Sequence, residues 1–129
     1  MDADAFFIFF RVILFAFFGS MHGTSKAFRD TIDHHWGRSI FALVKKQWLY
    51  VWLRSDWTEK PEHGWRSKIP PLWDGWHFGD FLTGLSPVSA AFYGLYAGLD
   101  AGVMVFYVFS AIVAFHFCYH RWFLVYGVD

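Results

Sequence analysis

An aspartate and a histidine stand three residues apart in the stretch Trp73-Asp74-Gly75-Trp76-His77-Phe78, where a polar middle region gives way to a long apolar segment. Carboxylate and imidazole groups together bind zinc or iron, and they also move protons. His35, from an earlier polar stretch, is a third candidate ligand. Two alternatives to a metal or proton-handling site remain. Asp74 and His77 could bind lipid headgroups, or Asp74 could cap a helix while His77 bonds to backbone or lipid, which we favour.

A second pair of histidines, His116 and His120, is spaced by one helical turn in the apolar C-terminal third. Histidines inside a membrane segment are candidates for function, and such a pair could bind a metal or supply a haem ligand. His120 adjoins Arg121, however, which indicates the membrane surface. The sequence contains no His-Glu-x-x-His, and no cofactor is identified.

The composition is that of an all-α integral membrane protein. The chain has 129 residues, of which 56% are hydrophobic, 24% aromatic and only 17% charged, and this length allows a single membrane domain over residues 1–129. The formal net charge is zero, which gives no argument for nucleic acid as a partner. One cysteine, Cys118, excludes a disulfide framework.

We expect about three transmembrane helices, at residues 3–22, 78–99 and 103–125. A secretory signal peptide is the competing interpretation of the first segment, but Asp2 and Asp4 stand where basic residues would be expected. Arg11 lies about 10 Å along that helix at 1.5 Å per residue. Its charge requires either snorkelling to the nearer surface, which we favour, or pairing with Asp100.

The middle of the chain is predicted to lie along the membrane surface. Thr24 or Ser25 could cap an interfacial helix over residues 25–54, and an irregular Trp-rich loop follows at residues 55–77. Seven of the eight tryptophans fall between Trp36 and Trp76, and tryptophan prefers the membrane–water interface. The residues expected at that interface are Lys45, Lys46, Trp48, Trp52, Trp73 and Trp76.

The last two spans are predicted to form a hairpin that turns at Leu99-Asp100-Ala101-Gly102, in preference to one long helix. Small residues recur every four positions there and would form a groove on one helix face, at which helix backbones approach closely. They are Ser86, Ala90, Gly94, Gly98 and Gly102. The first span, the third span and another subunit are all open as the partner of this groove.

Basic residues indicate the orientation. Nine of the 11 Lys and Arg lie between Lys26 and Lys68. The positive-inside rule therefore predicts a cytoplasmic middle region and an outside N-terminus, in a cell inner membrane. The expected partners are the lipid bilayer and either other membrane subunits or further copies of the chain.

The sequence also resembles small uncharacterised bacterial and phage membrane proteins that share a short N-terminal hydrophobic helix and a set of aromatic, histidine and aspartate positions. Here the matching residues are Asp30, His35-Trp36, Ser39, Phe41, Trp65, Lys68, Asp74, Trp76 and His77. The resemblance covers residues 1–85 and departs from the pattern around Gly64 and after His77. It implies no activity, but it suggests that His35 and the Asp74–His77 pair belong to one constellation.

Three classes of function remain open. We favour a structural or accessory membrane subunit that packs against other helices. The alternatives are a membrane enzyme that depends on a metal or binds lipid headgroups through the His35, Asp74 and His77 cluster, and a phage-encoded protein that perturbs membranes.

Overall fold

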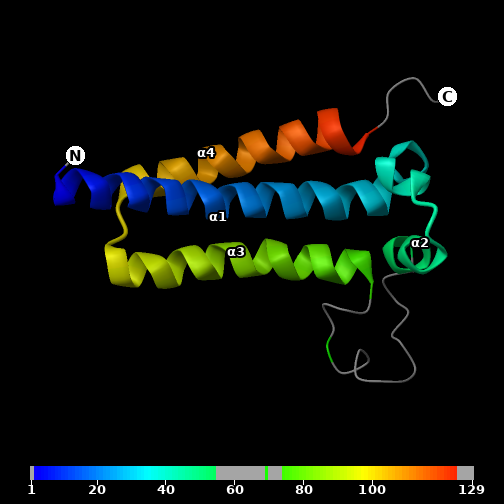
Figure 1. Cartoon of the computed structure of the whole chain (residues 1–129), viewed down its shortest axis with the longest axis horizontal. Helices are drawn as coiled ribbons and strands as arrows, with labels where there is room; N and C mark the ends of the chain where they lie inside the picture. Colours follow the sequence, from blue (N-terminus) through cyan, green and yellow to red (C-terminus); the bar gives the residue numbers. More distant parts are fainter. Residues whose placement is uncertain (1, 55–68, 70–73, 125–129) are drawn as a thin grey trace.

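The computed structural model describes residues 2–54, 69 and 74–124, and three long helices dominate that part of the chain (Figure 1). Helix α1 spans Ala3–His34, α3 spans Gly75–Ala97 and α4 spans Ala101–Phe117. The short helix α2 spans Gln47–Arg54, and a π-helical segment, η5, continues α4 over Cys118–Phe123. Apart from an isolated bridge between Ser39 and Leu124, these residues form helices and their connections. The all-helical prediction is confirmed for this part of the chain.

Helix α1 is much longer than the predicted first span. Asp2 caps it by accepting a 2.7 Å hydrogen bond from the backbone N–H of Ala5. The expected break at Thr24 or Ser25 is wrong, because the Ser25 hydroxyl donates to the carbonyl of Met21 at 2.6 Å within the same helix. Over 32 residues α1 is about 48 Å long.

The single interfacial helix predicted over residues 25–54 is also wrong. Its first part belongs to α1, and two 3₁₀ turns at Trp36–Arg38 (η1) and Ile40–Leu43 (η2) separate it from α2. Ser39, between these turns, is extended and buried, and its hydroxyl donates to the carbonyl of Trp36 at 2.8 Å. The resulting segment changes direction after α1 instead of continuing it (Figure 1).

The hairpin prediction is confirmed, with shifted boundaries. Helix α3 begins at Gly75, so the last three residues of the predicted 55–77 loop are helical. The turn begins at Gly98, whose φ of 88° is a conformation that glycine tolerates best. Asp100 then caps α4 by accepting from the N–H of Val103 at 3.0 Å. A single long helix is thereby excluded.

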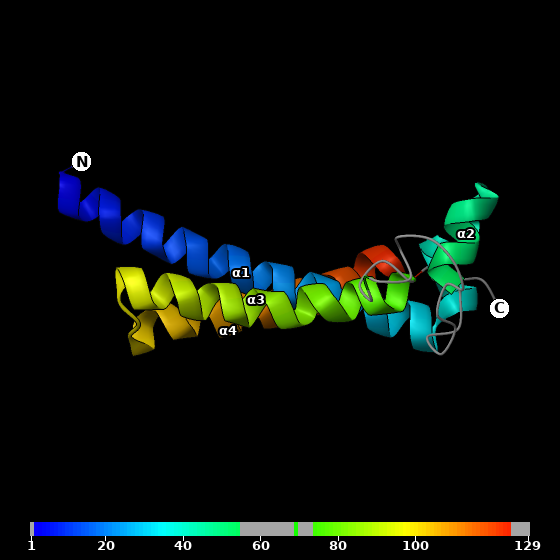
Figure 2. The same cartoon turned by 90° about the horizontal axis from the view of Figure 1, so that it is seen from below.

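Helix α1 is the centre of the bundle and packs against both α3 and α4 (Figure 1). Helix α3 runs antiparallel to α1, and α4 returns in the direction of α1. Phe15 of α1 is fully buried with Ala90 of α3 and Val103 of α4. The first turns of α1 extend beyond the hairpin (Figure 2).

Two helical segments in the described residues are long and apolar enough to cross a membrane, namely Ala3–His34 and Ala101–Phe123. Outward-facing side chains on these helices are large and apolar, such as Phe9 and Phe109. Helix α3 has 23 residues but is not in this apolar set. The structure thus supports two candidate spans of the predicted three.

Candidate functional site

The Asp74–His77 pair forms the corner at which the chain enters α3. Asp74 caps the helix and is fully buried, and its carboxylate accepts the backbone N–H of His77 at 2.8 Å. The other carboxylate oxygen lies 2.8 Å from His77 Nδ1. The His77 tautomer that carries its proton on Nδ1 donates this hydrogen bond to the Asp74 carboxyl group. The predicted cap is therefore present, and it also orients the imidazole ring.

His35 does not join this pair. Its ring packs edge-to-face on Tyr119 of η5, with centroids 5.5 Å apart. His116 and His120 stack on each other at 5.5 Å and are both exposed. Among the described residues, no three His, Cys, Asp or Glu side chains gather as metal ligands would. A metal site at His35, Asp74 and His77 stays a prediction, as does one at His116 and His120.

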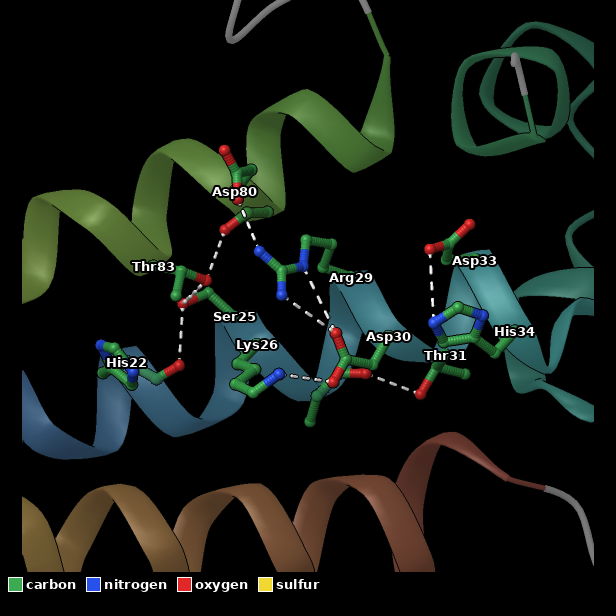
Figure 3. A network of polar contacts seen from close by, with 12 residues as sticks. His22, Ser25, Lys26, Arg29, Asp30, Thr31, Asp33, His34, Asp80 and Thr83 are labelled. Carbon is green, nitrogen blue, oxygen red and sulfur yellow. Dashed lines mark hydrogen bonds and ion pairs between the residues drawn. The ribbon is translucent and has the colours of Figure 1, made fainter. Parts of the chain in front are cut away.

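A charged network joins α1 to α3 near the same end of the bundle (Figure 3). Asp30 accepts from Lys26 at 2.8 Å and from Arg29 at 3.3 Å. Arg29 also reaches across to Asp80 of α3 at 2.5 Å. Two cations and two carboxylates balance in formal charge, which leaves no net charge to attract an ion. The contact between Arg29 and Asp80 holds α1 and α3 in register.

Two further contacts support this network. The Thr83 hydroxyl donates to Ser25 at 3.3 Å, again between α3 and α1 (Figure 3). The Arg29 guanidinium lies over the Trp76 ring, 5.8 Å from its centroid. Sequence reasoning missed this network. The spacing of Lys26 and Asp30 was a usable signal for their ion pair, whereas nothing in the sequence links Arg29 with Asp80.

The opposite end of the bundle is held by Arg11. Its guanidinium donates to Asp100 at 2.7 Å and to the carbonyl of Gly98 at 2.5 Å. The N–H of Val103 and then the Arg11 guanidinium hold the pKa of the Asp100 carboxyl below its usual value. Of the two alternatives for Arg11, pairing with Asp100 is the one observed.

The small-residue groove of α3 faces α1. Ser86, Ala90 and Gly94 are buried, and the Ser86 hydroxyl donates to the carbonyl of Phe18. A Cβ added at Gly94 would lie 3.6 Å from the Phe15 ring. Because α3 ends at Ala97, the groove does not continue to Gly102, which is exposed on the first turn of α4. Gly98 lies beside Arg11 at the turn.

A second close approach, between α1 and α4, was missed from sequence. Cβ atoms added at Gly19 and Gly23 would overlap the backbone carbonyl oxygens of Tyr107 and Ala111. Glycines four residues apart are a known signature of close helix packing in membranes. The spacing of Gly19, Gly23 and Ala27 was therefore a usable signal.

The residues expected at the membrane interface lie at the end of the bundle that carries α2. Lys45, Lys46 and Trp48 are exposed, and Trp52 packs on Phe78 with ring centroids 5.8 Å apart. Trp73 lies outside the described residues, as do Trp65 and Lys68 and most of the 55–77 loop.

No protein family, no curated protein and no solved structure matches this chain, so its function is inferred from the geometry alone.

Proposed function

We propose that this chain is a three-span membrane protein that serves as a structural or accessory subunit. It lies in the cell inner membrane with its N-terminus and the Gly98–Asp100 turn outside and its basic middle region in the cytoplasm. Lipid and other membrane helices are its partners.

The spacing of the two polar ends supports three spans. Arg11 and Asp100 pair at one end, and Lys26, Arg29 and Asp80 pair at the other. On α1 these levels are separated by about 23–27 Å at 1.5 Å per residue, close to the hydrocarbon thickness of about 30 Å. Helix α3 connects the same two levels, so it crosses the same distance as α1 and α4.

The polar residues of α3 are compatible with a span. Ser86 is fully buried against α1, and Asp80 pairs with Arg29. Its outward positions are large and apolar, for example Val88, Phe92 and Leu95, which are 51%, 70% and 85% exposed. Ser86 thus faces inward, the exposed Asp80 is paired near the cytoplasmic end, and the outward face between them and the turn is mainly hydrocarbon, as expected in lipid.

The single observation that carries a subunit role is the free N-terminal end of α1. Side chains from Phe6 to Phe10 are 47–60% exposed on every side of the helix, beyond the reach of the hairpin (Figure 2). Aromatic side chains there can pack against helices of another membrane protein. The charged groups of the three long helices that pair across the bundle, Arg11 with Asp100 and Arg29 with Asp80, serve its internal packing.

Purification from membranes in a mild detergent, with mass and bound metal measured on the same sample, tests the proposal. A defined partner should copurify, and Phe6→Ser with Phe9→Ser should release it. Phe92→Ser, a change at a more exposed position on α3, should leave the partner bound. A partner-free monomer would contradict the subunit role.

The purified sample tests the enzyme alternative, and cells that express the protein test the membrane-perturbing alternative. Metal bound to the wild type and lost in a folded His77→Ala variant would favour the enzyme. Loss of membrane potential on expression, unaffected by His77→Ala, would favour the membrane-perturbing protein.

A further inference from the structure

An apolar groove of about 480 Å³ opens on the side of α1 that neither α3 nor α4 covers. Its floor is one face of α1 from Phe17 to Phe28, and its sides are Leu82 of α3 and Phe123 of η5. The volume falls within the range of small-molecule sites, about 300–1,000 Å³. The groove lies in the half of the bundle nearest the charged network.

Two of the three hydroxyl groups on the floor, those of Thr24 and Ser25, have partners within the protein. The Ser25 hydroxyl donates to the carbonyl of Met21 and accepts from Thr83. The Thr24 hydroxyl lies 3.6 Å from the Cys118 sulfur. What remains is a surface of aromatic rings and aliphatic side chains, which suits hydrocarbon.

The shape of the groove suits a single extended hydrocarbon chain. From Phe17 to Phe28 the floor runs along one helix face for about 16 Å. Rings of Phe28, Phe41 and Phe123 line one end, with the centroids of Phe28 and Phe123 lying 5.0 and 5.1 Å from that of Phe41.

Three cationic side chains lie within five residues of Phe41 in the chain. Arg38, Lys45 and Lys46 flank the η2 turn that carries Phe41, and all three are exposed. In the described part of the chain none of them pairs with a carboxylate, in contrast to Lys26 and Arg29. These exposed cations near Phe41 would attract a lipid phosphate at that end of the groove.

We propose that this groove binds one acyl chain of an anionic phospholipid whose phosphate lies near Arg38, Lys45 and Lys46. The site rests on the membrane placement proposed above, and it assigns the bound lipid to the leaflet on the basic side. Ser20 lies on the floor of the groove, so a larger side chain at this position would fill the groove and tests the site.

The full chain is reconstituted in phosphatidylcholine vesicles that contain a trace of phosphatidylglycerol or phosphatidylcholine, each with the same spin label on its acyl chain. Electron paramagnetic resonance then measures the immobilised fraction of each probe. We expect the wild type to immobilise the phosphatidylglycerol probe about threefold more than the phosphatidylcholine probe at low salt. Ser20→Phe, which fills the groove, should abolish this preference. Lys45→Glu with Lys46→Glu should abolish it as well.

Val113→Phe is the matched control, since it adds bulk to an exposed position on α4 away from the groove. It should keep the preference. If Ser20→Phe loses its helical content, Leu82→Trp is used in its place, because it fills the groove from the α3 side.

Equal immobilisation of both probes by the wild type would overturn the site, and so would an unchanged preference in folded Ser20→Phe. A change of oligomeric mass in Ser20→Phe with lipid preference intact would assign the groove to a second copy of the chain. Failure of the wild type to float with the vesicles would instead contradict the membrane placement and, with it, the proposed function.

Discussion

Arg11 illustrates how one charged side chain is accommodated on an otherwise apolar helix. A guanidinium at this depth is costly unless it is paired. The hairpin turn supplies both a carboxylate, from Asp100, and a backbone carbonyl, from Gly98. Asp100 also caps α4, so one carboxylate ties the start of α4 to α1.

The Asp100→Asn variant tests whether the negative charge of Asp100 is what stabilises this contact between α4 and α1. Asparagine still caps a helix well, so the variant removes mainly the ion pair with Arg11. Because the folded pKa of Asp100 is lowered, its stabilisation is present above the unfolded pKa of about 3.9 and is lost as pH falls below it. The wild type should therefore be more stable than the variant at neutral pH, with the difference vanishing in acid.

Unfolding midpoints in a denaturing detergent, followed by helical circular dichroism between about pH 3 and about pH 7, measure this difference. Comparing the two proteins at each pH cancels the effects of all groups that both proteins retain. A difference that persists undiminished at the acid end would show that Arg11 does not stabilise the fold through the Asp100 charge.

At the scale of the helices, backbone proximity determines how α1 meets α4. Lipid tails are as apolar as the side chains, so helices in a membrane associate through close packing rather than through hydrophobic burial. Gly19 and Gly23 permit this contact because no Cβ separates them from the carbonyls of α4. The α1–α4 pair is therefore the most sensitive contact in the bundle.

Gly23→Ala should destabilise the bundle by about 1–3 kcal/mol, the usual effect of overpacking. The new Cβ would overlap the Ala111 carbonyl oxygen and lie 2.8 Å from the Phe115 nitrogen, and backbone atoms cannot rotate away. Gly84→Ala is the control, because nothing lies within 4 Å of its Cβ. It should stabilise α3 by about 0.5–1 kcal/mol. Equal unfolding free energies for wild type and Gly23→Ala would refute the close α1–α4 contact.

The same helices show which features are readable from sequence. The hairpin was predictable because Gly98 and Asp100 combine a flexible turn with a helix cap, both of which are local effects. The end of α1 was not, because Thr24 and Ser25 resemble caps locally but bond within the helix or to its neighbours. The choice between these roles depends on packing against α3 and α4, which local sequence does not encode.

The candidate site also contains some features that the sequence predicts and others that it does not. The Asp74 cap and its contact with His77 span three residues, so spacing alone predicts them. The separation of His35 from this pair depends on the turn after His34, which directs its ring toward Tyr119. The Arg29–Asp80 ion pair joins residues 51 positions apart, and only the antiparallel register of α1 and α3 brings them together.

For the molecule as a whole, the number of spans is the decisive property. If α3 crosses the membrane, the N-terminus and the Gly98–Asp100 turn lie on one side and α2 lies on the other. The Arg11–Asp100 pair places the first two features at the same end of the bundle, and the packing of Trp52 on Phe78 joins α2 to the opposite end of α3.

Single cysteines introduced into a Cys118→Ala background test this arrangement. Asp4→Cys and Gly102→Cys should react with a membrane-impermeant maleimide on intact cells, because both lie at the end assigned to the outside. Lys46→Cys should react only after permeabilisation, and labelling of all three in permeabilised cells controls for their exposure. Labelling of Asp4→Cys without Gly102→Cys would show that the hairpin does not cross. Labelling of Lys46→Cys alone on intact cells would show that the orientation is the reverse of the proposed one. Three spans would still hold, because the two ends of the bundle would then simply exchange sides.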